Sequence, residues 1–75
     1  MTLCDTMIHV NENLDQQARN TLEEKMRMID GVIAPRFNPG KAHLLLISFN
    51  SQLTTAQRLL ETVHQQGYHA QLVGL

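Results

Sequence analysis

The sequence is poor in the features that mark several large functional classes. Its 75 residues include a single cysteine, Cys4, which excludes an internal disulfide and fits a reducing compartment. Six Lys and Arg side chains stand against seven Asp and Glu, without a basic run, so neither nucleic acid nor an anionic membrane is an expected partner. The first residues, M-T-L-C-D-T-M, do not place a basic segment before a long apolar one, so no signal peptide or membrane span is expected. These absences favour the cytoplasm as the location.

Catalytic motifs are missing as well. No cysteine, serine or carboxylate lies at motif spacing from a recognisable base, and no phosphate-binding loop is present. Cys4 has no basic neighbour in the sequence that would activate its thiol. The sequence therefore predicts a protein that is not an enzyme and that needs no cofactor.

The length predicts one small domain over residues 1–75. Apolar residues make up 43% of the chain and charged residues 17%, which is typical of a globular protein. A chain this short buries only about 60% of the surface that it exposes when unfolded. Its stability is therefore expected to be marginal, and self-association would help it.

Four segments have the alternation or the apolar content of β-strands. The most apolar of them, 43–49 (H-L-L-L-I-S-F), is predicted to be a central strand. Its side chains that face the helices are expected to be Leu45, Ile47 and Phe49. Pro35 cannot donate a hydrogen bond to a neighbouring strand, so its strand is expected at a sheet edge. The predicted strands are 5–10, 32–37, 43–49 and 69–73.

The first of two amphipathic helices is predicted after the N-cap Asp15 and continues to about Ile29. Gly31 is well placed to end it in a left-handed conformation. Glu23 and Arg27, four residues apart, are expected to pair on its outer face. The apolar stripe of this helix is Ala18, Leu22, Met26 and Ile29.

The second helix is predicted to be capped by Thr54 and to stop at Gly67. Its apolar stripe is Ala56, Leu59, Leu60 and Val63. The order βαββαβ predicts an α+β fold, a ferredoxin-like sandwich with two helices on one face of a four-stranded antiparallel sheet. The first and third strands are expected to be central and the second and fourth to lie at the edges.

A resemblance to a known family is carried by two glycine pairs and their spacing. The segment from Val10 to Val32, the pair Gly31-Val32 and the ending G-Y-H-A-Q-L-V, with Gly67-Tyr68-x-Ala70, resemble a heavy-metal-associated (HMA) domain. This is the fold of small copper chaperones and of the N-terminal modules of metal-pumping P-type ATPases. The resemblance covers nearly the whole chain and implies the same fold.

The resemblance also implies a metal loop of the form Gly-Met-x-Cys-x-x-Cys between the first strand and the first helix. In an alignment without a gap, Glu12 and Asn13 replace the glycine and the methionine. Asp15 replaces the first cysteine and Ala18 the second. Thiolates hold Cu(I) and Zn(II) as soft anionic donors, and a carboxylate with a methyl group cannot replace two of them. A metal ion is therefore not an expected ligand of this loop.

Histidines offer an alternative metal site. His9 and His69 lie on neighbouring strands in the expected topology and point away from the helices, with Asp15 or Glu12 nearby. Imidazole and carboxylate ligands would suit Zn(II), Ni(II) or Cu(II) in a metal-binding or metal-trafficking module. The other interpretation, two solvated histidines at the ends of strands, is the one that we favour.

The face of the sheet away from the helices is unusually apolar for a solvated surface. By alternation it collects Met7, Leu44, Leu46 and Val73. A contiguous apolar patch marks a partner surface more often than an accident. We expect a protein partner or a second copy of the chain on this face, and hence a non-catalytic domain that acts through protein contact. A small-ligand regulatory domain of similar layout would need a glycine-rich ligand loop, which the sequence lacks.

Overall fold

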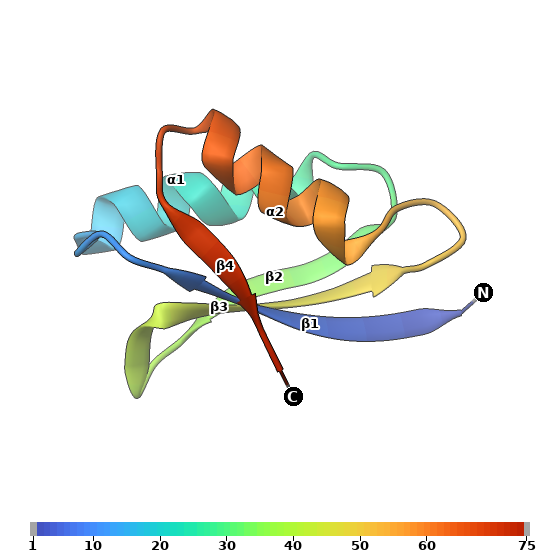
Figure 1. Cartoon of the computed structure of the whole chain (residues 1–75), viewed down its shortest axis with the longest axis horizontal. Coiled ribbons are helices and arrows are strands. Elements are labelled where there is room, and N and C mark those ends of the chain that lie inside the picture. The colour runs from blue at the N-terminus through green and yellow to red at the C-terminus, as the bar shows by residue number, and fades with distance from the viewer. Residues whose placement is uncertain (1, 75) are drawn as a thin grey trace.

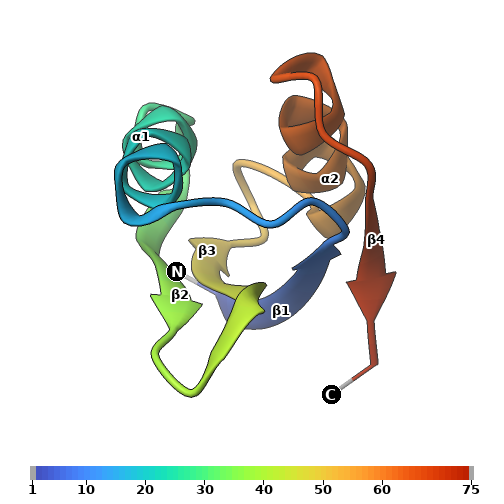
Figure 2. The same cartoon turned by 90° about the vertical axis from the view of Figure 1, so that its left-hand side faces the viewer.

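The computed structural model describes residues 2–74 and contains the six expected elements in the expected order (Figure 1). They are β1 (Leu3–Val10), α1 (Gln16–Arg27), β2 (Val32–Asn38), β3 (Lys41–Asn50), α2 (Ala56–Gln65) and β4 (Ala70–Val73). The sheet is antiparallel with the strand order β2-β3-β1-β4, so the first and third strands are central. Both helices cover the same face, α1 over β2 and α2 beside β4 (Figure 2). The prediction of a ferredoxin-like α+β sandwich is confirmed.

The core lies between the helices and the inner face of the two central strands. Leu45, Ile47 and Phe49 are buried there as predicted, and they alternate with half-buried neighbours on the other face of β3. The fully packed set comes from four elements. It consists of Ile8, Val10, Leu22, Met26, Leu45, Ile47, Phe49, Leu59 and Val63.

Helix α1 begins as predicted and ends earlier than predicted. The carboxylate of Asp15 accepts a hydrogen bond from the backbone N–H of Ala18 at 2.8 Å, so Asp15 is the N-cap. The last helical residue is Arg27, two residues before Ile29. Gly31 has φ +97°, and a Cβ on it would lie 2.8 Å from the Cβ of Leu53. This glycine therefore serves the close turn from α1 into β2, a few residues beyond the helix itself.

Two local predictions were wrong. The cap of α2 is Thr55, whose hydroxyl accepts from the backbone N–H of Arg58 at 3.1 Å, while Thr54 is buried beneath the turn. Glu23 does not pair with Arg27, because its carboxylate accepts the backbone N–H of Phe37 at 2.8 Å. Arg27 pairs with Glu24 instead. The carboxylate of Glu23 is engaged by a backbone donor that the tertiary fold brings near it, whereas the cap of α2 is a local bond in the first turn of the helix.

The strand boundaries also differ from the predicted ones. β1 begins at Leu3, two residues before the predicted start, and β3 runs from Lys41 to Asn50. Leu3 and Cys4 extend β1 because they pair with Asn50 and Phe49 at the end of β3. Lys41 extends the start of β3 because it pairs with Asn38 of β2. β2 lies at the edge as Pro35 required, and it carries an irregularity between Val32 and Ala34.

The inward and outward positions of β3 predict opposite effects of a carboxylate at adjacent residues. Ile47→Asp should place a charge in the core and lower the free energy of unfolding by at least about 3 kcal/mol, enough to unfold a small domain. Leu46→Asp should stay folded, because its half-buried side chain can turn a carboxylate to water. Thermal melts followed by circular dichroism check this, and equal losses in the two variants would contradict the assignment of faces.

Candidate functional site

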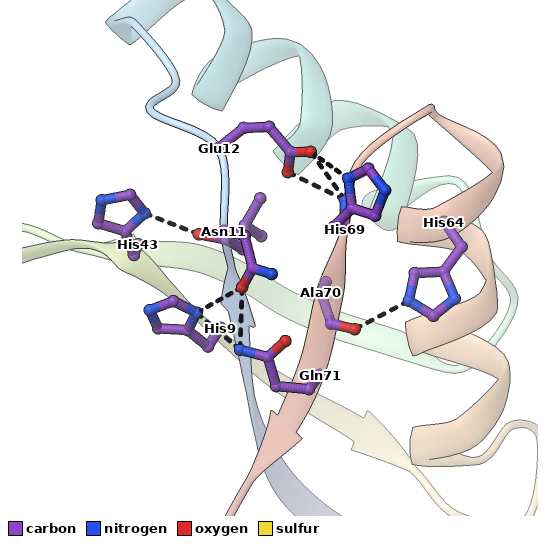
Figure 3. Close-up of polar contacts among 9 residues, drawn as sticks. His9, Asn11, Glu12, His43, His64, His69, Ala70 and Gln71 are labelled. Atoms are coloured by element: carbon purple, nitrogen blue, oxygen red, sulfur yellow. Dashed lines mark hydrogen bonds and ion pairs between the residues drawn. The ribbon is translucent and has the colours of Figure 1, made fainter.

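The loop between β1 and α1 is closed onto the start of β4 (Figure 3). The carboxylate of Glu12 accepts the backbone N–H of His69, at 2.9 and 3.0 Å to its two oxygens. It also accepts the ring Nδ1–H of the same histidine at 2.7 Å. The backbone N–H of Asn11 donates to the carbonyl of His69 at 2.8 Å. This loop, which the resemblance identifies with the metal loop, is thus tied to β4 by protein groups.

The two positions aligned with the metal-binding cysteines are bonded to one another. Asp15 holds the N–H of Ala18 through its carboxylate, and Ala18 offers only a methyl group. The positive end of the α1 dipole, which favours an anion, is already occupied by an anionic side chain of the same chain. The arrangement offers no soft donor at either position.

The hydrogen-bonded contact between Glu12 and His69 has an effect on the titration of Glu12. The hydrogen bond from the His69 side chain, with help from backbone N–H groups, holds the pKa of Glu12 below its ordinary value, although partial desolvation acts against it. The ionised carboxylate is therefore the form that the folded state favours. Because His69 is 83% exposed, the pair is well solvated and its contribution is small.

Replacement of Glu12 by Gln should reveal this contribution as a pH-dependent difference in stability. A carboxylate whose pKa is lower in the folded state stabilises the fold above its unfolded-state pKa and loses this effect as the pH falls through the folded-state value. Wild type should be slightly the more stable at neutral pH, and the difference should vanish in acid. Urea titrations near pH 7 and near pH 3 measure it. Glu61→Gln, on the exposed side of α2, is the control, and an equal pH dependence in that variant would contradict the assignment.

The predicted histidine ligands have separate partners. The Nδ1 atom of His9 lies 2.8 Å from Nε2 of Gln71 and 3.1 Å from Oδ1 of Asn11, while His69 binds Glu12 (Figure 3). Asp15 is engaged as the helix cap. Within residues 2–74, no group of three or more His, Cys, Asp or Glu side chains is placed to hold a metal ion. The structure does not bring His9, His69 and Asp15 together as one ligand set.

Two further histidines lie at the same end of the sheet. The ring of His43 stacks on that of His9 with centroids 5.4 Å apart, and its Nδ1–H donates to the carbonyl of Val10 at 2.7 Å. The Nε2–H of His64 donates to the carbonyl of Ala70 at 2.9 Å. Both rings therefore hold strand ends in place. The stacking of His9 on His43 was not predicted, and it depends on the pairing of β1 with β3.

The predicted interaction face has the expected composition. Leu46 lies opposite Met7, Met7 lies opposite Val73, and Leu44 lies opposite His9, so the apolar side chains are neighbours on adjacent strands. All four of them are half-buried. Beside them is an open hollow of about 320 Å³ whose lining includes Asp5, Arg36 and Ser48. Arg36 and Asp5 were not predicted as site residues, because their nearness depends on the strand register.

The helix-covered side has one feature that was not predicted from the sequence. An open depression of about 830 Å³ lies between the end of α1 and α2, and its rim includes Met28 and Leu53. These two side chains are 82% and 62% exposed. The rest of the lining is mostly polar, so the open sheet face is the more continuous apolar surface.

The other candidates are structural. Cys4 is half-buried, pairs with Phe49 across β1 and β3, and packs against the core at the end of the sheet opposite the loop. Tyr68 is also half-buried and packs against the core.

Neither helix in residues 2–74 is long and apolar enough to cross a membrane.

Comparisons with known proteins identify the fold. No protein-family model and no curated protein sequence matches this chain. Among solved structures, oxidised MerP from Ralstonia metallidurans superposes with a TM-score of 0.85 at 14% identity, covering 97% of this chain and 100% of MerP. The N-terminal domain of a potential copper-translocating P-type ATPase from Bacillus subtilis, in its Cu(I)-loaded state, gives 0.85 at 19% identity over 97% of this chain and 90% of that domain.

A third structure agrees with these two. The copper-binding domain of HMA7, a P-type ATPase, has a TM-score of 0.84 at 14% identity, covering 93% of each chain. The predicted HMA-type ferredoxin-like fold is thereby confirmed. Identities this low show that the fold is shared, and the activity has to be argued from the residues of this chain.

Proposed function

We propose that this chain is a non-catalytic domain of the HMA fold that has lost its soft-metal site and acts through protein contact. The observation that carries the proposal is the hydrogen bond from the Ala18 N–H to the Asp15 carboxylate, at the two positions aligned with the metal-binding cysteines. The solved relatives in fold include a Cu(I)-loaded domain and a copper-binding domain. This chain keeps their architecture and has different chemistry at the loop.

The chemistry of Cu(I) supports this reading of the loop. Cu(I) prefers thiolate and thioether sulfur, and a pair of cysteines at the start of a helix supplies two such donors. Asp15 supplies oxygen and Ala18 supplies no donor. The carboxylate of Glu12, a second oxygen group in the loop, is engaged by His69. Release of these internal bonds would still leave no sulfur in the loop.

The open sheet face supports the contact role. Its four apolar side chains, Met7, Leu44, Leu46 and Val73, are neighbours on three adjacent strands. A sheet with one solvated face normally has polar residues there. We infer that a protein covers this face, either a second copy or another member of a larger assembly. We place this role in the cytoplasm, where the lone Cys4 would remain reduced.

Competition for Cu(I) against a chelator tests the loss of the metal site. Wild type and Cys4→Ser should show no competition, because the loop contains no sulfur. Substitution of both Asp15 and Ala18 by Cys should create measurable Cu(I) binding, since the helix start that would present the two thiolates is formed. Tight binding by wild type that persists in Cys4→Ser would refute the proposal.

The histidine alternative is tested with harder metal ions. An excess of Zn(II) or Ni(II) should leave the melting temperature of wild type unchanged, because His9 and His69 have separate partners. A site built on them would raise the melting temperature by mass action and would lose that effect in His9→Ala and in His69→Ala. A metal-dependent rise that both variants abolish would show that the histidines form a metal site.

A further inference from the structure

The open face has a regular geometry that the linear sequence does not display. One row crosses all four strands, because the strand register aligns Arg36, Leu46, Met7 and Val73. Leu44 lies on β3 two residues to one side of this row, opposite His9. Asp5 lies on β1 two residues to the other side, opposite Ser48. The charged residues are thus at one side of the face and the apolar residues run through its centre.

Two pairs of residues on this face are separated by the same displacement, which is called a step here. The step from Arg36 to Asp5 crosses two strands and moves two residues along, and the step from Leu44 to Val73 does the same in the same direction. With neighbouring strands about 4.8 Å apart and a rise of about 3.4 Å per residue, each step is about 10 Å across and about 7 Å along. The line that joins the midpoints of the two steps is perpendicular to both of them.

That line has the position of a two-fold axis. When two copies face each other, a half-turn rotation about an axis in the plane between them places each residue opposite the position that lies across the axis on the partner's face. In projection onto the sheet this operation acts as a reflection across the line. Reflection across this line exchanges Arg36 with Asp5 and Leu44 with Val73. The line also passes midway between Leu46 and Met7, which are directly opposed across β3 and β1, so these two are brought near each other as well. Apolar positions then meet apolar positions, and a cation meets an anion.

We propose that the open face binds a second copy of this chain across this axis, an inference that rests on the contact role proposed above. In the dimer, Leu44 of each protomer packs on Val73 of the partner subunit and Leu46 packs on Met7 of the partner subunit. Arg36 of each protomer pairs with Asp5 of the partner subunit, so two ion pairs lie at the two ends of one apolar strip.

The charges within one protomer leave both groups available for this contact. The guanidinium of Arg36 has no hydrogen bond or ion pair with any group in residues 2–74, while its backbone belongs to the β2–β3 ladder. Asp5 accepts one hydrogen bond, from the hydroxyl of Ser48 at 2.6 Å to Oδ1. Its second carboxylate oxygen has no hydrogen-bond partner within residues 2–74. Both line the same hollow without forming an ion pair to each other. A guanidinium from a facing copy would find a carboxylate already oriented by Ser48.

Self-complementarity is what favours a second copy over an unrelated protein. An unrelated partner could bind this face whatever the displacements from Arg36 to Asp5 and from Leu44 to Val73, because it need not match this chain's own pattern. A two-fold contact requires that both pairs share one axis, and the register meets this requirement. At the far end of the same axis, reflection brings His9 close to Gln71 of the partner subunit, so the polar ends also match.

A charge exchange tests the dimer. Arg36→Glu sets two acidic side chains against each other at both ends of the strip, and Asp5→Arg sets two arginines against each other. Each variant alone should raise the dissociation constant by at least about tenfold, because like charges in a contact are costly. An equimolar mixture should restore association, since the glutamate of one variant then faces the new arginine of the other. Sedimentation velocity of each variant and of the mixture measures this, with circular dichroism to verify folding.

Matched controls distinguish the effect of where the charges lie on the open face from the effect of net charge on self-association. Arg58→Glu and Asp30→Arg make the same changes of net charge at exposed positions away from the open face, and they should self-associate as wild type does. A wild type that is monomeric at millimolar concentration would overturn the inference. So would folded variants that associate as wild type does, or a mixture in which association is not restored.

A third variant, Leu46→Asp, distinguishes failure of the two-fold arrangement from failure of the proposed contact role. Its control is Leu53→Asp on the helix-covered side. Loss of the dimer in Leu46→Asp and in both charge variants, with recovery in the mixture, is the expected result. Loss in Leu46→Asp alone would retain the open face as the contact surface and overturn the two-fold arrangement. A dimer that survives Leu46→Asp would overturn the arrangement together with the role of the open face.

Discussion

The antiparallel pairing of β1 with β3 is the constraint on which the rest of the structure depends. The pairs Thr6–Ile47 and Ile8–Leu45 turn their side chains toward the helices and form the centre of the core. The alternate pair, Met7 with Leu46, is turned to the other face by the same pleat. A shift of one residue in this register would exchange the two faces. The core, the apolar strip and the charges beside it therefore depend on one register, and a change there would alter all three.

The fold was predictable from the sequence because its signals are local and agree with one another. The alternation in β1, the helical stripe that includes Leu22 and Met26, and the glycines after both helices each specify one element. The cap at Asp15 was predictable for the same reason, since donor and acceptor are three residues apart. Where two adjacent threonines could each cap α2, the local signals did not distinguish them, and the structure has Thr55 as the cap.

The site was less predictable, because its contacts join distant parts of the chain. Glu12 and His69 are separated by 57 positions, and their contact depends on the strand order that sets β4 beside β1. The approach of Arg36 to Asp5 likewise depends on β3 lying between their strands. Side-chain alternation placed Met7, Leu44, Leu46 and Val73 on one face. It could not give the offsets between strands, and those offsets carry the argument for a two-fold axis.

The loop and the open face are physically continuous. The amide Nε2 of Gln71 on β4 donates to the Asn11 side chain at 3.0 Å, and the His9 ring on the open face contacts both (Figure 3). Asn11 also holds the backbone of His69, whose side chain binds Glu12. A protein seated on the open face near His9 therefore contacts a network that ends in the closed loop.

This continuity bears on the contact role proposed above. In a domain whose loop binds a metal, ligands at the start of the first helix must remain accessible, so internal bonds there would compete with binding. Once Asp15 caps the helix and Glu12 binds His69, the same end of the sheet becomes a fixed polar border beside an apolar strip. A fixed border costs little conformational entropy when a partner covers it. The closed loop at this end of the sheet is therefore compatible with the contact role proposed above.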